Sequence, residues 1–190
     1  MDPLNVQAQR DLGFAYLKEG SQDHAQKAVA IFQTLSSWDP ANLLARRDLS
    51  VAYDQLGTLQ AASGKLAAAI ENYRRLLENT RDWLARDPEN LSASQMMATA
   101  HVKLSEALLA TRDKSQALQS AQTAHAVFEQ LHEKDKNNLE FSRGLAISAI
   151  TLGKALCESS RSSEAKSGRA PGNGCAIAQR DRRSPGALQD

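Results

Sequence analysis

Apolar side chains recur at steps of three and four residues over long stretches of the chain. After Asp39, this spacing joins Leu49, Ala52 and Leu56 in one run, and a second run follows a break at Ser63-Gly64. Spacing of this kind places the apolar residues on one face of an α-helix. The pattern therefore predicts pairs of helices, each pair joined by a short turn, and an all-α chain.

A four-residue motif, Asp-Pro-x-Asn, marks the start of each helix pair. It occurs at 2–5, 39–42 and 87–90, with a degenerate copy at 135–138, so the steps are 37, 48 and 48 residues. Equal steps indicate an internal repeat. We expect the Asp to cap the next helix and the Pro to occupy its first position, which also ends the preceding helix.

The residues inside these units resemble the signature of the tetratricopeptide repeat. This resemblance implies a right-handed α-solenoid of stacked antiparallel helix pairs. The predicted units span about 2–38, 39–86 and 87–134, with a partial unit at 135–158. The matching residues are Leu12, Gly13, Tyr16, Gly20 and Ala25 in the first unit, Tyr53, Leu56, Gly57, Gly64, Ala69 and Tyr73 in the second, His101, Leu104, Ser105, Ala117 and Ala121 in the third, and Leu152, Gly153 and Leu156 in the fourth.

Small residues recur at fixed places in the units. Three glycines are expected to let the paired helices approach closely, three alanines to lie where the helices cross, and two further glycines to adopt positive φ in the turns. These are, in the same order, Gly13, Gly57 and Gly153, then Ala25, Ala69 and Ala117, then Gly20 and Gly64.

The composition changes at Ser159, where a segment rich in Ser, Gly and Arg begins. The sequence therefore predicts a repeat domain at 1–158 and a disordered tail at 159–190. The last helix is expected to end at about residue 159 and to leave Ile147 and Ile150 facing outward. An exposed apolar patch of this kind predicts a homodimer formed through the last helix.

Charge and composition narrow the classes of partner and the location. The chain has 23 Lys and Arg against 22 Asp and Glu, and this near-zero balance argues against a nucleic-acid partner. The longest apolar stretch, from Leu145 to Leu156, is too short to span a membrane. The two cysteines, Cys157 and Cys175, form no disulfide framework, so the default is a reducing compartment and a cytoplasmic location.

Candidate catalytic and metal-binding residues are few. His125, Glu129 and His132 share one helical face, but no fourth ligand is evident, so a solvated face is the favoured interpretation. Hydrolase, kinase and phosphate-loop motifs lack their essential residues. The sequence therefore predicts no enzyme activity, no metal and no cofactor.

The resemblance instead implies a non-catalytic protein–protein interaction scaffold that binds a peptide or helix in a concave groove. An alternative is an interaction or sensing segment of a bacterial Ser/Thr kinase-type signalling protein, because Arg47-Asp48-Leu49 follows the motif as in such arrays. A chaperone C-terminus is disfavoured, since Asp54 and Glu106 break the basic set that grips its carboxylates. The predicted groove residues are Arg10, Phe14, Lys18, Asp54, Thr58, Val102, Glu106, Ile150 and Lys154.

Overall fold

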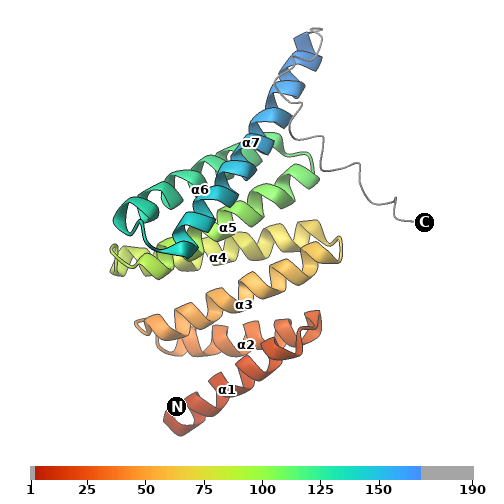
Figure 1. The fold of residues 1–190 in the computed structure, drawn as a ribbon. Coiled ribbons are helices and arrows are strands. Elements are labelled where there is room, and N and C mark those ends of the chain that lie inside the picture. The colour runs from red at the N-terminus through yellow and green to blue at the C-terminus, as the bar shows by residue number, and fades with distance from the viewer. Residues whose placement is uncertain (1–2, 168–190) are drawn as a thin grey trace, which may run out of the picture.

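The computed structural model describes residues 3–167, and all regular elements of this part are α-helices. Consecutive helices pack against each other, so the chain forms a stack from α1 at one end to α7 at the other (Figure 1). This confirms the predicted all-α array, while its handedness stays a prediction. The helices are α1 (Pro3–Glu19), α2 (Gln22–Trp38), α3 (Leu43–Ala62), α4 (Leu66–Arg86), α5 (Leu91–Ala110), α6 (Lys114–Lys134) and α7 (Leu139–Ser167).

Asparagine, rather than aspartate, caps the helices that follow the repeated motif. The side chain of Asn42 accepts hydrogen bonds from two backbone N–H groups of α3 at 3.1 Å, and Asn90 accepts one from α5 at 2.9 Å. Asp39 and Asp87 are instead the C-caps of α2 and α4. The predicted Asp cap was therefore wrong at these two copies, and so was the predicted Pro at the first helical position, since Pro40 and Pro88 lie in the turns. The motif forms a turn, and its fourth residue is the one that directly precedes the new helix.

Left-handed residues form the turns inside the helix pairs. Gly20 has φ +70° and Gly64 has φ +75°, as the sequence predicts. The residue 48 positions after Gly64 is Arg112, and it adopts the same conformation with φ +66°. A side chain with a Cβ is disfavoured there, because the Cβ lies too close to the following carbonyl oxygen. The repeat therefore fixes this turn even where its glycine is missing.

Glycine in one helix and an aromatic ring in the next set the spacing within the first two pairs. A Cβ added at Gly13 would lie 2.6 Å from the Phe32 ring, and one added at Gly57 would lie 2.6 Å from the Tyr73 ring. The predicted close approach at these glycines is confirmed. The three alanines predicted at the helix crossings are also buried, each at 1% exposure or less: Ala25, Ala69 and Ala117.

The third predicted glycine contact, at Gly153, is absent. Gly153 occupies the same repeat position as Gly57, yet nothing in the described chain lies within 4 Å of a Cβ added there. Gly13 and Gly57 are covered by the helix that follows them, and no described helix follows α7. A different glycine of α7, Gly144, packs closely, because the ring of Phe128 in α6 occupies its missing Cβ position.

Helix α7 is longer than predicted and ends at Ser167 instead of near residue 159. The helix of each earlier unit ends just before a left-handed residue, Gly64 or Arg112, whereas the corresponding position in α7 is Ser160. Residues 159–167 are therefore helical, and the predicted disorder at 168–190 lies outside the described residues.

One cysteine differs from the sequence expectation. Cys157, which is half-buried on α7, is disulfide-bonded. The second cysteine, Cys175, lies outside the described residues. The reducing compartment inferred from the cysteine count therefore has no support from Cys157.

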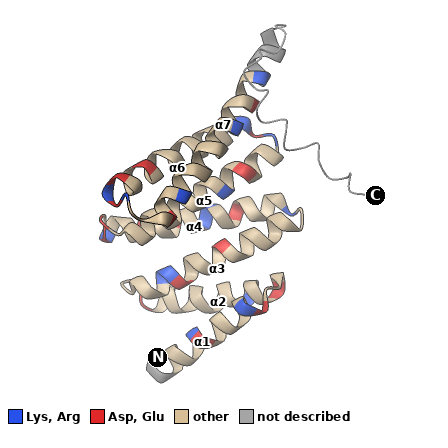
Figure 2. Cartoon of the chain, in the orientation of Figure 1, with Lys and Arg blue, Asp and Glu red and all other residues tan. Residues whose placement is uncertain are grey.

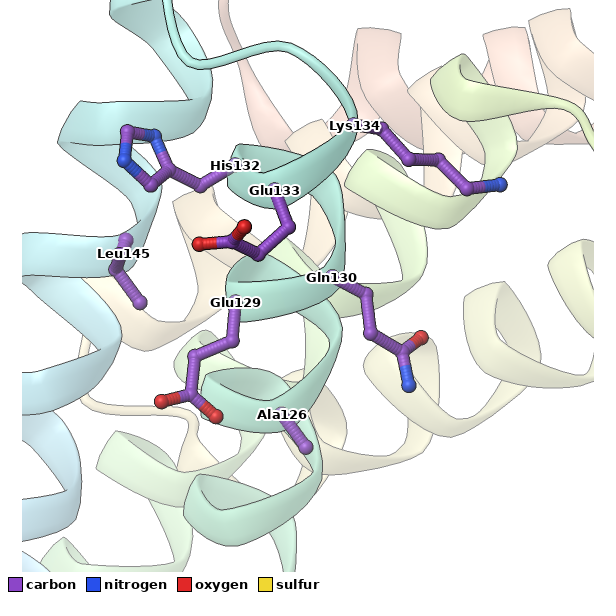
Figure 3. Close-up of a pocket in the computed structure, with 7 residues that line it drawn as sticks. All are labelled: Ala126, Glu129, Gln130, His132, Glu133, Lys134 and Leu145. Atoms are coloured by element: carbon purple, nitrogen blue, oxygen red, sulfur yellow. The ribbon is translucent and has the colours of Figure 1, made fainter.

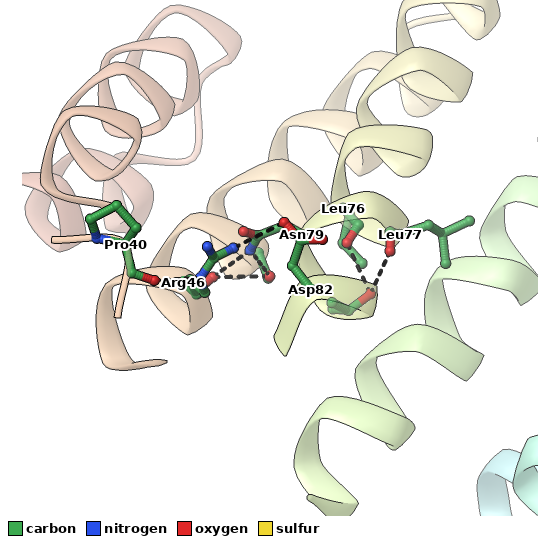
Figure 4. Close-up of polar contacts among 8 residues, drawn as sticks. Pro40, Arg46, Leu76, Leu77, Asn79 and Asp82 are labelled. Atoms are coloured by element: carbon green, nitrogen blue, oxygen red, sulfur yellow. Dashed lines mark hydrogen bonds and ion pairs between the residues drawn. The ribbon is translucent and has the colours of Figure 1, made fainter. Parts of the chain in front are cut away.

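A buried polar layer joins α3 to α4 (Figure 4). Asn79 of α4 donates hydrogen bonds to the Arg46 carbonyl at 2.7 Å and to the Ser50 hydroxyl at 2.6 Å. The Arg46 guanidinium bonds the Pro40 carbonyl at 3.1 Å and lies 3.3 Å from the Asp82 carboxylate. The Asn79 bonds satisfy buried polar groups, and together with the exposed Arg46–Asp82 ion pair they join α4 to α3.

The outer surface agrees with two further expectations. Ile147 is 41% exposed and Ile150 is 60% exposed, so both face outward from α7 as predicted. Figure 2 shows acidic and basic residues distributed along the whole stack, in keeping with the net charge of +1. None of the described helices is both long enough and apolar enough to cross a membrane.

Alanine at two glycines of the same repeat position is predicted to change stability in opposite directions. At Gly57 the added methyl group collides with Tyr73, and overpacking of this kind costs about 1–3 kcal/mol. At Gly153 the space is open, so alanine stabilises the helix by about 0.5–1 kcal/mol. Urea unfolding of both variants and the parent chain measures the two differences. Destabilisation by both substitutions would show that the Gly153 face is packed.

Glycine at residue 112 is predicted to stabilise the chain. Arg112→Gly removes a Cβ from a left-handed residue and raises the free energy of unfolding by about 1 kcal/mol. The matched control is Arg47→Gly at an exposed position inside α3, which lowers it by about 1 kcal/mol. Thermal or urea unfolding compares the two variants, and a loss of stability in both would contradict the left-handed turn.

Candidate functional site

The nine predicted groove residues fall into two repeat positions, with Lys18 in addition. Residues 10, 54, 102 and 150 share one position, and residues 14, 58, 106 and 154 share the other, since the units are offset by 44, 48 and 48 residues. The structure separates the two sets. In the first set, Arg10, Asp54 and Val102 lie between neighbouring helices, whereas Ile150 is 60% exposed on α7. The second set is exposed in every unit.

Arg10, from the first set, makes contacts within the chain. Its Nε lies 2.6 Å from a carboxylate oxygen of Asp48 in α3, and the Asp48 side chain is only 3% exposed. Its guanidinium also lies 5.8 Å from the centre of the Phe14 ring, close enough for a cation–π contact. Arg10 therefore ties α1 to α3 and is not available to a ligand in this arrangement.

Asp54 has the same role between α3 and α5. Both of its carboxylate oxygens accept hydrogen bonds from Lys103 Nζ, at 2.6 and 2.7 Å, and Lys103 also donates to the Thr58 hydroxyl at 3.1 Å. The sequence analysis did not single out Lys103. Its repeat position is that of Gln55, which donates to the Leu17 carbonyl of α1, so a polar link to the preceding unit recurs there.

Val102 is a correction to the predicted site. It is only 6% exposed and packs in the core cluster that includes Phe128, Leu131 and Phe141. The physical reason is that its repeat position faces the following unit, and α6 and α7 occupy that space. Val102 belongs to the core and is removed from the site.

The second set forms a surface that we call the exposed row, namely Phe14, Thr58, Glu106 and Lys154. All four are exposed, and they come from α1, α3, α5 and α7 in turn. Phe14 is 38% exposed, and its ring packs against Phe32 with 5.1 Å between ring centres. Lys18, one helical turn beyond Phe14, is exposed as well. The row thus offers an apolar group, a hydroxyl, an acid and a base.

A tyrosine from α4 lies beside the middle of the exposed row. Burial raises the pKa of the Tyr73 hydroxyl, a hydrogen bond with Thr58 opposes this rise, and the Asp54 and Glu106 carboxylates add to it. These groups from α3, α4 and α5 are therefore close enough to influence one another. Asp54 and Thr58 are joined by their shared contact with Lys103, and Glu106 lies on α5, the helix that carries Lys103.

A separate depression lies between α6 and α7 (Figure 3). It has a volume of about 660 Å³, and Leu145 of α7 lies opposite the side chains of α6. None of the nine predicted residues contributes to it. The lining residues are Ala126, Glu129, Gln130, His132, Glu133, Lys134 and Leu145.

The two histidines of the candidate metal face contact serines of α7. Nδ1 of His125 lies 3.3 Å from the Ser148 hydroxyl, and Nδ1 of His132 lies 3.3 Å from the Ser142 hydroxyl. Within residues 3–167, no group of three or more His, Cys, Asp and Glu side chains could hold a metal ion. Each of the two histidines therefore contacts a serine of α7.

The sequence matches no protein-family model and no curated protein. The similarity to the tetratricopeptide repeat therefore depends on the residues quoted above and on the architecture of the stack.

The histidine that replaces Tyr53 one unit later is predicted to make stability depend on pH. Burial, with a smaller contribution from the nearby Arg81, lowers the pKa of His101 from its ordinary 6.5 to about 4. The folded chain therefore binds fewer protons than the unfolded chain between these pH values, so stability falls as the pH falls from 6.5 to 4. Unfolding of the parent chain and of His101→Phe, measured at pH 7 and pH 5, should show a larger loss in the parent. Equal losses would contradict a buried neutral His101.

Proposed function

We propose that this chain is a non-catalytic protein–protein interaction scaffold that binds a peptide across the exposed row. The observation that carries this proposal is that Phe14, Thr58, Glu106 and Lys154 share one repeat position and are exposed in all four units. The neighbouring position, four residues earlier, is engaged in ion pairs or buried at the first three units. The residues at this neighbouring position therefore join the helices to one another, and the exposed row remains accessible to a peptide.

The chemistry of the row indicates what kind of peptide fits. Phe14 supplies an apolar anchor at the α1 end, where Lys18 adds a positive charge. Glu106 and Lys154 favour a basic and then an acidic residue as the peptide continues toward α7. Anchoring by an apolar side chain and orientation by a few charges is a common mode of peptide recognition. The resemblance to the tetratricopeptide repeat supports the same function.

A charge reversal in the row tests this proposal. Peptides are first selected on the 190-residue chain from a random library, and their affinities are then measured by fluorescence anisotropy. Glu106→Lys is expected to weaken the selected peptides by about tenfold or more, which corresponds to about 1.4 kcal/mol. The matched control is Glu78→Lys, the same change at an exposed position of α4, which is expected to leave their affinity unchanged.

Two results would contradict the proposal. One is that the library gives no peptide with saturable binding to the chain. The other is that Glu106→Lys and Glu78→Lys alter the affinities of the selected peptides equally, because the row would then have no special part in binding.

A further inference from the structure

The exposed face of α7 repeats a face that is buried elsewhere in the chain. Ala146, Gly153 and Leu156 are all exposed, and Leu156 is 48% exposed. The residues 48 positions earlier are buried between α5 and its neighbours, and they are Ala98 (0%), Ser105 (0%) and Leu108 (3%). The residues 96 positions earlier are buried by α4, and they are Ser50 (0%), Gly57 and Gln60 (6%).

In both pairs that carry the glycine, an aromatic ring covers it. Phe32 of α2 lies against Gly13, and Tyr73 of α4 lies against Gly57, each at 2.6 Å from the missing Cβ. Gly153 has the same repeat position, and none of the residues that the structure describes lies within 4 Å of its missing Cβ. We propose that the α7 face around Gly153 is a docking site for an amphipathic helix of a partner, which places an aromatic side chain on Gly153. This site goes beyond the exposed row.

The contacts between α3 and α4 show which other residues such a helix would carry. Besides placing Tyr73 on Gly57, α4 donates from Asn72 to the Gln60 side chain at 2.8 Å and from Asn79 to the Ser50 hydroxyl at 2.6 Å. On α7 the residues that correspond to Gln60 and Ser50 are Leu156 and Ala146. A partner helix therefore needs apolar residues where α4 has these asparagines, one residue before its aromatic residue and six residues after it.

Charge adds to this specificity. Arg143 and Lys154 are exposed on α7, so a partner helix with carboxylates at its edges is favoured. In the α3–α4 pair the corresponding end is bridged by Arg46 and Asp82, which lie 3.3 Å apart. Arg143 is one residue beyond the position that corresponds to Arg46, so a carboxylate like that of Asp82 suits the site.

A second copy of this chain joined through α7 alone is less favourable. An antiparallel pair of α7 helices centred between Ile147 and Ile150 would set Arg143 of each copy opposite Lys154 of the other. Like charges placed directly opposite each other weaken such a contact. A foreign helix with an apolar stripe and acidic edges avoids this repulsion.

The probe is a synthetic peptide with the 21-residue sequence of α4 in which both asparagines are leucine, corresponding to Asn72→Leu and Asn79→Leu. Fluorescence anisotropy of the labelled peptide is measured against the whole 190-residue chain. The leucine peptide is expected to bind saturably at concentrations up to about 500 µM, as a small interface allows. Replacing its tyrosine by alanine, or restoring the two asparagines, is expected to weaken binding by about tenfold or more.

Protein variants place the binding on α7. Gly153→Trp fills the open position and is expected to abolish binding, and Ala146→Glu is expected to do the same through an unpaired charge at the interface. The matched control, Ala30→Trp, makes a comparable change at an exposed position of α2 and should bind the peptide as the parent does. Circular dichroism checks that each variant is folded. Glu106→Lys should not alter binding of this probe, which separates this test from that of the exposed row.

Three results would overturn the proposal. The first is equal binding of the leucine and asparagine peptides. The second is full binding by a folded Gly153→Trp chain. The third is no binding by the parent chain, which would mean that another segment of the chain or a second copy already covers the face; sedimentation velocity would show which.

Discussion

Close contact between consecutive helices at small side chains is the constraint on which the rest of the structure depends. The rings of Phe32 and Tyr73 occupy space that a Cβ would need at Gly13 and Gly57. Such packing leaves few positions along each helix where the next helix can lie. The repeated spacing then determines which side chains fall between the helices and which remain exposed. Both proposed binding surfaces consist of side chains that this spacing leaves exposed.

Much of the fold could be predicted from the sequence because its signals are local. The apolar period predicted the helices, and Gly20 and Gly64 predicted the turns with positive φ. The capping residue could not be chosen in this way, because Asp and Asn are equally good caps. Only the turn in the structure shows that Asn42 directly precedes its helix.

The candidate site was harder to predict, because two positions four residues apart both point away from the paired helix. Thr58 and Glu106 are exposed as expected, whereas Val102 is buried by a unit that lies later in the chain. The apolar side chain of Val102 is the signal that could have distinguished it from Arg10 and Asp54 at the same repeat position, because apolar residues favour burial. Ile150 shares that position but stays exposed, since no described helix follows α7. Lys103 was missed because its partner, Asp54, lies 49 residues away in the sequence.

The exposed face of α7 is a consequence of the same repeated spacing, at the end of the described array. A face that α3 and α5 bury against neighbouring helices is repeated in α7. Compared with α3, α7 keeps the glycine and has alanine in place of Ser50 and leucine in place of Gln60. Since the array packs each such face elsewhere, an exposed copy is a surface already shaped to receive a helix. Because this face is more apolar than that of α3, it favours a partner helix whose sequence differs from that of α4.

The central claim is that α7 presents an exposed copy of a buried face. Carbene footprinting of the unmodified chain at low micromolar concentration tests it directly, because photogenerated carbenes label side chains according to their exposure. The account predicts strong labelling of Ile150 and little labelling of Val102, its counterpart 48 residues earlier. Equal protection of Ile150 and Val102 in the monomeric chain would contradict it.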